Sequence, residues 1–153
     1  MQIEIVRYAE QYKPYFRSLN EEWLNKYFSI TSADRKILEN PEKILESGGQ
    51  VLFALCDGVV AGTCAYIPHG EESYELIKMG VTERFQGRGI GYHLIREVIA
   101  EAKKAGMKKV LLETASSLHS AISLYKRAGF IQYSPEEVHP DFGRMTFKMS
   151  LEV

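Results

Sequence analysis

The sequence predicts one α/β (α+β) domain with a mixed, mostly antiparallel central sheet flanked by helices. The chain has 153 residues, of which 45% are hydrophobic, and a domain of this size buries most of its apolar surface. Runs that alternate apolar and polar residues are interspersed with segments whose apolar residues recur every three or four positions. A hairpin signal joins two of the runs. Because no Pro/Gly/Ser-rich linker divides the chain, residues 1–153 are expected to form a single domain.

The N-terminal third predicts one strand followed by helices. Residues 2–8 alternate as a strand does, and residues 11–28 show the helical period. A second helix is expected to begin near Ser32 or Asp34, both good caps, and to break at Asn40-Pro41, since proline suits the first turn of a new helix. The apolar positions of the first helix are Tyr12, Phe16, Leu19, Trp23 and Tyr27.

Two β-rich runs, residues 51–56 and 59–67, follow and are joined by Asp57-Gly58, a strong hairpin signal. Pairing about this turn sets Cys56 opposite Val59 and Cys64 opposite Val51. The two cysteines then do not face each other, so the sequence predicts two buried thiols rather than a disulfide or a metal site. Residues 73–81 form a third run and complete a three-stranded region.

The C-terminal half alternates helices and strands. A helix is expected from near Gly89 to Gly106, a strand over residues 109–114, and a helix over residues 118–128 closed by Gly129. Residues 130–133 and 145–151 are the last two expected strands. The resulting order, β-α-α-β-β-β-α-β-α-β-β, predicts a sheet with helices packed on it.

Composition argues against several classes of partner. Nineteen Lys and Arg against twenty Asp and Glu give a net charge of −1, which disfavours nucleic acid and anionic lipid as partners. No apolar run approaches the ~18 residues that a membrane span requires, and Glu4 and Glu10 interrupt the region where a signal peptide is apolar. A cytoplasmic protein with no nucleic-acid or membrane partner is therefore expected.

The most informative segment is the glycine-rich loop at residues 86–91, between an expected strand and an expected helix. Glycines let the backbone approach a ligand, and the first N–H groups of the helix are free to bind anionic oxygen. A phosphate-binding G-x-x-x-x-G-K-[ST] run is absent from the sequence, and the dinucleotide pattern G-x-G-x-x-G fails at Tyr92. The pattern [QR]-x-x-G-x-[GA] is satisfied by Gln86, Gly89 and Gly91.

This loop, the preceding strand YELIKMGV, the later strand LLET and the segment AISLYKRAGF resemble the GCN5-related N-acetyltransferase (GNAT) family in order and spacing. The resemblance spans roughly residues 51–133. It implies a GNAT-like acyl-CoA N-acyltransferase fold and acetyl-CoA as cosubstrate, with no metal. The coenzyme-binding residues that it implies are Met79, Gly80, Val81, Gln86, Gly87, Arg88, Gly89, Ile90, Gly91 and Tyr92.

The resemblance also implies two catalytic residues. Tyr125 matches the tyrosine that protonates the coenzyme sulfur, although its spacing also suits a core aromatic. Glu75 stands where a histone-acetylating branch has its general base, although a solvated strand residue is the alternative. The family's frequent asparagine is replaced by Ala115, and the following Ser116 and Ser117 are expected to cap the next helix.

The acceptor site is less well defined by sequence. In the family it is formed by the first helices, the strand before the glycine loop and the C-terminal region. The helical spacing of Trp23 and Tyr27 favours a place in the core instead. Clustered acidic side chains favour an amine over an anionic acceptor. The candidate residues are Trp23, Tyr27, Tyr66, Tyr74, Glu71, Glu72 and His139, the last within the loop of residues 134–143.

These observations predict an acetyl-CoA-dependent N-acetyltransferase that moves an acetyl group to a primary amine, of a small molecule or a peptide, by direct attack. The alternative from another class is a non-catalytic acyl-CoA-binding sensor or regulatory module, because a fold can keep its ligand loop without the chemistry. O-acyl or longer-chain transfer would use the same loop. The protein is expected to act as a monomer or a homodimer.

Overall fold

The computed structural model describes residues 2–153 and contains one eight-stranded sheet in the order β1-β2-β3-β4-β5-β8-β6, with β7 paired to β8. All strand pairs are antiparallel except β4 and β5, which are parallel, so the predicted mixed, mostly antiparallel sheet is confirmed. The strands are β1 (Ile3–Arg7), β2 (Gln50–Cys56), β3 (Val59–His69), β4 (Ser73–Val81), β5 (Lys109–Ala115), β6 (Ile131–Gln132), β7 (Glu137–Val138) and β8 (Met145–Glu152). The helices are α1 (Lys13–Tyr27), α2 (Ser32–Leu38), α3 (Pro41–Glu46), α4 (Ile90–Lys104) and α5 (His119–Ala128).

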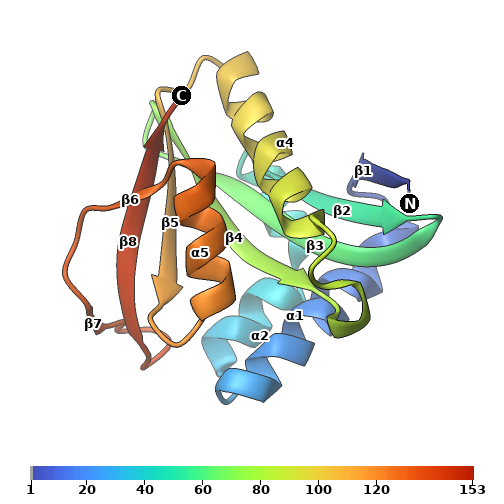
Figure 1. Cartoon of the computed structure of the whole chain (residues 1–153), viewed down its shortest axis with the longest axis horizontal. Helices are drawn as coiled ribbons and strands as arrows, with labels where there is room; N and C mark the ends of the chain where they lie inside the picture. The colour runs from blue at the N-terminus through green and yellow to red at the C-terminus, as the bar shows by residue number, and fades with distance from the viewer. Residues whose placement is uncertain (1) are drawn as a thin grey trace.

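Helices cover both faces of the sheet (Figure 1). Helices α4 and α5 lie in front of it in that view, whereas α1 and α2 lie behind and below. Each face has its own core: one packs α4 and α5 against the sheet, and the other packs α1, α2 and α3 against β2 and β3. None of the helices in residues 2–153 has the length and apolarity to cross a membrane.

Local sequence signals account for most element ends. Proline begins α3, and Gly129 ends α5 with φ 107°, a conformation that favours glycine. Helix α2 begins at Ser32 as expected, but its N-cap is Thr31: the Thr31 side chain accepts from the Asp34 N–H, and the Asp34 carboxylate accepts from the Thr31 N–H. The two-residue strand β7 was not predicted, since it has no length over which alternation shows.

The β2–β3 hairpin corrects one predicted pairing. Asp57 and Gly58 take φ of 50° and 84°, as a two-residue hairpin turn requires, and Cys56 does pair with Val59. A β-bulge between Ala54 and Leu55 then shifts the register by one, so Cys64 faces Leu52 rather than Val51. Both cysteines are nevertheless buried free thiols, as predicted.

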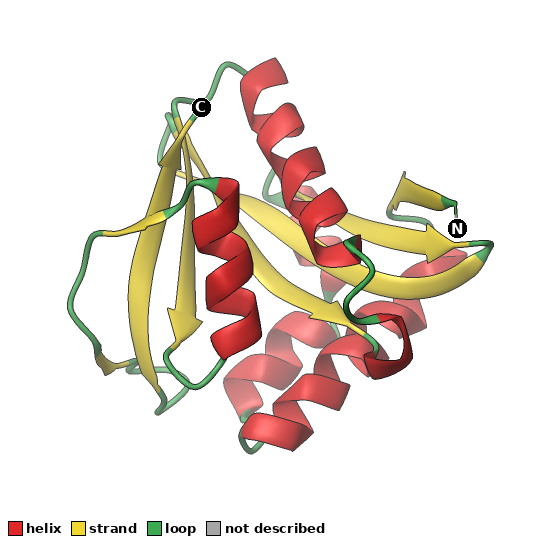
Figure 2. Cartoon of the chain, in the orientation of Figure 1, coloured by secondary structure: helices red, strands yellow, loops and turns green. Residues whose placement is uncertain are grey.

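The most consequential feature of the sheet is the divergence of β4 from β5. The two strands pair from Ser73 and Lys109 as far as Leu76 and Leu112, where their described pairing ends. Figure 2 shows them splaying apart beyond this point. On the other edge of β4, the register against β3 shifts near Lys78, whose φ is 50°. The bulge therefore lies in the part of β4 that has no described pairing with β5.

Candidate active site

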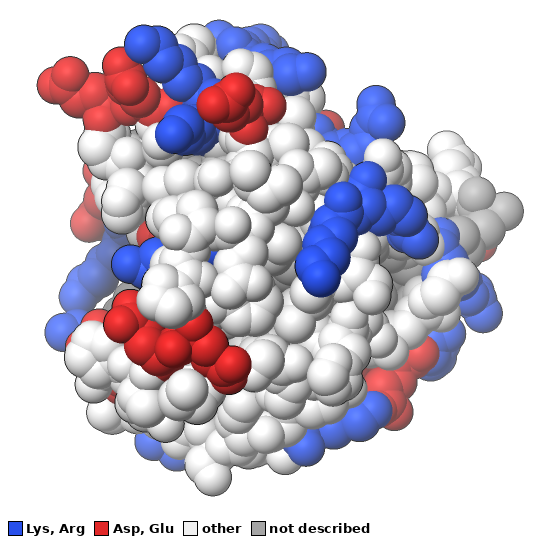
Figure 3. Space-filling view, turned by 60° about the vertical axis from the view of Figure 1, so that its left-hand side comes forward, with Lys and Arg blue, Asp and Glu red and all other residues white. Residues whose placement is uncertain are grey.

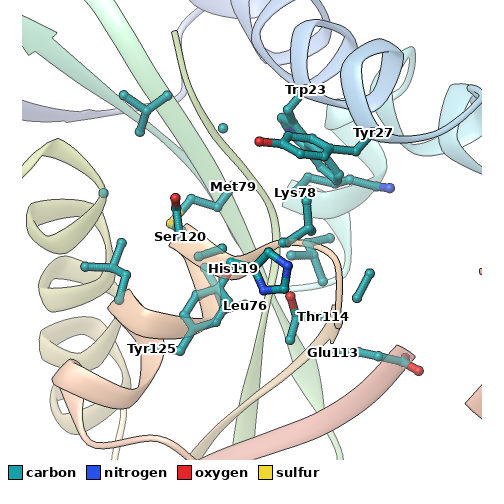
Figure 4. Close-up of a pocket in the computed structure, with 18 of the residues that line it drawn as sticks. Trp23, Tyr27, Leu76, Lys78, Met79, Glu113, Thr114, His119, Ser120 and Tyr125 are labelled. Atoms are coloured by element: carbon teal, nitrogen blue, oxygen red, sulfur yellow. The ribbon is translucent and has the colours of Figure 1, made fainter. Parts of the chain in front are cut away.

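The gap between β4 and β5 leads into a cleft of about 770 Å³. Trp23 and Tyr27 project into it from α1 on one side, and His119, Ser120 and Tyr125 come from α5 on the other (Figure 4). The glycine-rich loop, the start of α4 and the loop before β8 complete its walls. Within residues 2–153, no group of three or more His, Cys, Asp or Glu side chains is placed to hold a metal ion.

The glycine-rich loop has the backbone geometry of an anion cradle. Gly87 and Gly89 take φ of 77° and 81°, and Gly89 is the N-cap of α4. The Gln86 side chain donates to the carbonyl of Val81 at 3.0 Å and so ties the loop to the end of β4. The first N–H groups of α4 have no carbonyl within the helix to bond, so they are suited to bind phosphate oxygens.

Two further glycines are required by close packing. A Cβ on Gly91 would lie 2.8 Å from Cδ2 of Leu124, so the start of α4 packs directly on α5. A Cβ on Gly80 would lie 2.9 Å from the Leu19 carbonyl oxygen and from Cδ1 of Trp23, so β4 packs equally tightly on α1. Nine of the ten predicted coenzyme residues line the cleft: Met79, Gly80, Val81, Gln86, Gly87, Gly89, Ile90, Gly91 and Tyr92.

Arg88 is the tenth predicted coenzyme residue, and the described lining of the cleft does not include it. Its side chain is exposed, and its guanidinium lies 5.3 Å from the ring centre of Phe85. The loop therefore presents its backbone, rather than this side chain, to the cleft.

Tyr125 is both a core aromatic residue and a residue of the cleft wall. Only 8% of the residue is exposed, and its ring lies edge-on to Phe130 with centroids 6.0 Å apart. It also lines the cleft. Burial raises the pKa of its hydroxyl, which keeps the proton in place at neutral pH. A buried, protonated hydroxyl at a cleft wall is suited to donate a proton.

Glu75 faces the cleft because of strand alternation. Its neighbours Tyr74 and Leu76 point into the α4 core, so Glu75 points to the opposite face. Tyr66 and Tyr74 pack against each other in that core with ring centres 4.5 Å apart, and the described cleft lining includes neither of them. Burial raises the pKa of Glu75, and the negative charge of Glu113 adds to the effect.

Sequence reasoning missed Glu113, a second carboxylate in the cleft. It accepts a hydrogen bond from Oγ1 of Thr146 at 2.7 Å and lies 3.4 Å from Nε2 of His139. Nδ1 of His139 accepts from the Asp141 N–H at 3.0 Å, which places the ring proton on Nε2, facing Glu113. The strand LLET contains this glutamate, but the alternation of a short strand does not show which face opens into a cleft.

Two other expectations are corrected. Ser116 donates to Glu136 at 2.6 Å, and the N-cap of α5 is Leu118, so neither serine caps that helix through its side chain. Tyr27 is 47% exposed and lines the cleft with Trp23, so the first helix contributes to the pocket as well as to the core.

The acidic residues predicted to cluster near β4 do not all face the cleft. Glu72 forms an exposed ion pair with Lys108 at 3.0 Å, and the described cleft lining includes neither Glu71 nor Glu72. The strand turn at residues 70–72 directs these side chains to the sheet end, while Glu75 faces inward. The carboxylates that share the cleft are therefore Glu75 and Glu113.

Comparison with known proteins supports the arrangement just described. The family model of the acetyltransferase (GNAT) family matches residues 8–130. N-acetyltransferase family 8 member 2 of Rattus norvegicus is 36% identical over 88 residues, which is 57% of this chain and 37% of that protein. An uncharacterized N-acetyltransferase of Methanocaldococcus jannaschii is 41% identical over 75 residues, which is 48% of this chain and 33% of that one. The chain thus spans about a third of the length of these curated relatives.

Solved structures agree over nearly the whole chain. A GNAT acetyltransferase from Staphylococcus aureus Mu50 superposes with a TM-score of 0.86 at 24% identity, covering 99% of both chains. The ribosomal-protein-alanine N-acetyltransferase of Brucella melitensis gives 0.80 at 25% identity, covering 98% of this chain and 99% of that one. The acetyltransferase yncA from Salmonella typhimurium, determined with acetyl-CoA, gives 0.77 at 22% identity, covering 99% and 94%. With this fold and a family match over residues 8–130, the chain belongs to the GNAT family of acetyltransferases.

Proposed function

We propose that the protein transfers an acetyl group from acetyl-CoA to a primary amine, of a small molecule or a peptide, by direct attack. The observation that carries this proposal is the splay of β4 from β5. It gives one cleft with two carboxylates, Glu75 and Glu113, the buried hydroxyl of Tyr125 and the glycine-rich loop at its edge.

The residues of the loop and of β4 fit the coenzyme. The pyrophosphate would bind the N–H groups at the start of α4, where Gly87 leaves open space and Gly89 has the required positive φ. The pantetheine arm would lie along Met79–Val81, since this part of β4 has lost β5 as a neighbour and offers backbone groups. This arrangement directs the thioester toward the bulge of β4.

The chain's side chains then have distinct roles in the reaction. The amine nitrogen attacks the thioester carbonyl carbon, a C–N bond forms, and the C–S bond breaks. Glu75 accepts the proton that the ammonium must lose, and its raised pKa makes it a stronger base than an ordinary carboxylate. Tyr125 donates its proton to the departing thiolate, and the second proton that the amine nitrogen loses as it becomes an amide restores the tyrosine hydroxyl. Backbone groups of β4 near Met79 stabilise the oxyanion.

We further infer that neither nucleic acid nor a membrane is a partner, and that the protein works in the cytoplasm as a monomer or a homodimer. The net charge of −1 supports the first inference. In Figure 3, Lys and Arg side chains and Asp and Glu side chains surround a broad uncharged area rather than forming one face of a single sign.

The proposal is tested by incubating the protein with acetyl-CoA and a panel of primary amines and measuring the coenzyme A thiol released. Turnover is expected with at least one amine. Tyr125→Phe keeps the buried ring and is expected to lower kcat by about 10²- to 10⁴-fold, the usual contribution of a positioned acid, with unchanged affinity for acetyl-CoA.

Three results would contradict the proposal or part of it. Tight binding of acetyl-CoA without turnover of any amine would favour the sensor or regulatory module. Full turnover by Tyr125→Phe would leave this tyrosine with a packing role only. Turnover of alcohols, or of longer acyl thioesters in preference to acetyl-CoA, would redefine the reaction as O-acyl or longer-chain transfer.

A further inference from the structure

A buried group of three charges lies at the acceptor side of the cleft. Asp34 of α2 is fully buried, and the side chains of Lys78 and Arg144 are only 8% and 10% exposed. Nζ of Lys78 lies 2.8 Å from Oδ1 of Asp34, and Nη1 of Arg144 lies 3.2 Å from the same oxygen. Nη2 of Arg144 contacts Oδ2. We call these three residues the cationic cluster, because two positive charges share one carboxylate.

Aromatic rings enclose the cluster. Nζ of Lys78 lies 4.6 Å from the ring centre of Phe142, and the Arg144 guanidinium lies 4.8 Å from Phe28 and 5.1 Å from Phe142. These rings exclude water and strengthen the field of the charges. Both cations and both rings line the cleft, so the cluster belongs to the wall of the proposed active site.

The hydrogen bonding of the cluster is incomplete. The Nε of Arg144 is buried, and no hydrogen-bond partner for it exists among residues 2–153. Lys78 has three donors, and the hydrogen bond described for it goes to Asp34. Buried donors that lack acceptors cost stability, and two cations on one carboxylate leave an excess positive charge. The cluster therefore has both the charge and the donors to accept one more anionic group.

Lys78 lies at an irregular point of the β4 backbone. Its φ of 50° is uncommon for a residue with a side chain and costs stability, and the register shift of β4 falls at the same place. The bulge turns the Lys78 side chain toward α2, while Glu75 and Glu113 lie in the cleft nearer the paired ends of β4 and β5. The cleft thus has positive and negative charge at separate places.

We propose that the acceptor is an amine that also bears a carboxylate, an α-amino acid or a closely similar compound, and that Lys78 and Arg144 bind this carboxylate. This inference rests on the proposed function. The carboxylate of the acceptor pairs with the cationic cluster, and its ammonium group lies toward Glu75 and Glu113. The side chain of the acceptor meets the apolar wall formed by Trp23, Tyr27 and Phe28.

The experiment measures binding, so that it does not depend on turnover. The protein is saturated with coenzyme A and titrated by calorimetry with L-leucine and L-phenylalanine, and separately with their carboxamides, which keep the amine and lack the negative charge. At least one amino acid is expected to bind about 10- to 100-fold more tightly than its carboxamide, the effect of losing a charge-assisted hydrogen bond.

Variants separate binding from structure. Lys78→Met keeps the length of the side chain and is expected to abolish the preference for the carboxylate, whereas Lys78→Arg should retain most of it. Lys104→Met is the control, because Lys104 is exposed at the end of α4, far from the described lining of the cleft. Thermal unfolding of each variant shows which of them remain folded under the assay conditions.

Equal affinity for amino acid and carboxamide, or no measurable binding of either, would overturn this proposal. An equal loss of both affinities in Lys78→Met would overturn it too, since the cluster would then have only a structural role. Failure of the proposed function is distinct: selective binding of the amino acid without release of coenzyme A thiol from acetyl-CoA would contradict acetyl transfer and leave the carboxylate site intact.

Discussion

At the scale of single residues, the chemistry of the cleft depends on how burial changes two acids. Removing a charge from water disfavours the ionised form, so burial raises the pKa of both Glu75 and Tyr125. For Tyr125 this keeps the hydroxyl protonated at neutral pH, as a proton donor must be. For Glu75 it produces a carboxylate with greater affinity for a proton. One physical effect thus keeps Tyr125 protonated and raises the basicity of Glu75.

The role of Glu75 is tested with Glu75→Gln, which preserves size and removes the charge. We expect kcat/KM for a cationic amine to fall, because neither attraction nor proton removal remains. The deficit should shrink as pH rises toward the amine's pKa of about 10, where free amine becomes abundant. In the unmodified protein, the acidic limb of the profile should lie above the ordinary glutamate pKa of 4.5.

Glu72→Gln is the matched control, since this exposed glutamate pairs with Lys108 outside the described cleft lining. A Glu75→Gln profile parallel to that of the unmodified protein at every pH would transfer the role of base to Glu113.

The stability of the Glu75→Gln variant gives a second test. Because the folded-state pKa of Glu75 is raised, its ionisation destabilises the folded protein as pH rises above the unfolded-state value. Glu75→Gln should therefore unfold less readily at neutral pH, with no difference well below pH 4.

At the scale of elements, the proposed coenzyme site is the backbone at the start of α4. Gly89 has φ of 81°, which a residue with a Cβ adopts at a cost of roughly 1–2 kcal/mol. A substitution there either strains the fold or rotates the N–H groups away from the phosphates. Coenzyme binding should thus depend on glycine at this position more than on any exposed side chain of the loop.

Gly89→Ala is expected to weaken acetyl-CoA binding about tenfold or more by calorimetry. Gly106→Ala is the matched control, because Gly106 also has positive φ, 77°, with open space around it, but lies beyond the other end of α4. Both variants should lose similar stability, and only Gly89→Ala should lose affinity. Equal affinities for the coenzyme in the two variants would show that loop geometry does not determine binding.

The β4 bulge is the second element on which the site depends. It lies just beyond the point where the pairing of β4 with β5 ends, and it directs Lys78 to Asp34, so the same local irregularity borders the proposed coenzyme channel and forms part of the cationic cluster. Burial raises the pKa of Asp34 in isolation, but the hydrogen bonds from Arg144 and Lys78 outweigh it and hold this pKa well below its usual range. Asp34 is therefore ionised at physiological pH and pairs with both cations, whereas burial lowers the pKa of Lys78.

At the scale of the whole molecule, the two thiols report on global opening. Cys56 and Cys64 are 1% and 0% exposed and lie on the side of the sheet that α4 covers. Burial raises the pKa of the Cys64 thiol, so the reactive thiolate is disfavoured. A thiol reagent should therefore modify neither cysteine in the folded protein and both after denaturation. This also keeps the protein's own thiols out of the coenzyme A assay.

Acetyl-CoA, which has no free thiol, should slow this modification. A ligand at 100 times its Kd stabilises the folded state by about 2.7 kcal/mol, which lowers the population of the open form about 100-fold. Quantifying modified cysteine by mass spectrometry with and without acetyl-CoA measures the effect. Labelling that is fast in the folded protein, or indifferent to acetyl-CoA, would show that the α4 side of the sheet opens locally and independently of the ligand.

The sequence by itself determined the elements and the coenzyme loop. Alternation, helical period and turn residues are local properties, so the strands, most helix ends and the hairpin at Asp57-Gly58 were predictable. The glycine loop was predictable for the same reason, because its function lies in backbone conformation that glycine permits. Glu75 and Tyr125 were found through a spaced motif, and the structure brings both to the cleft.

The residues on the proposed acceptor side of the cleft could be identified only from the tertiary structure. The cationic cluster joins Asp34, Lys78 and Arg144 from three distant parts of the chain, and Glu113 meets His139 across a loop. The bulges that set the facing of Cys64 and Lys78 depend on how neighbouring strands pair, which no local pattern contains. The sequence does not show which charged side chains will pair with one another. Their partners are fixed only when folding brings them together and removes water, and for this reason the charges of the cleft could be located only in the tertiary structure.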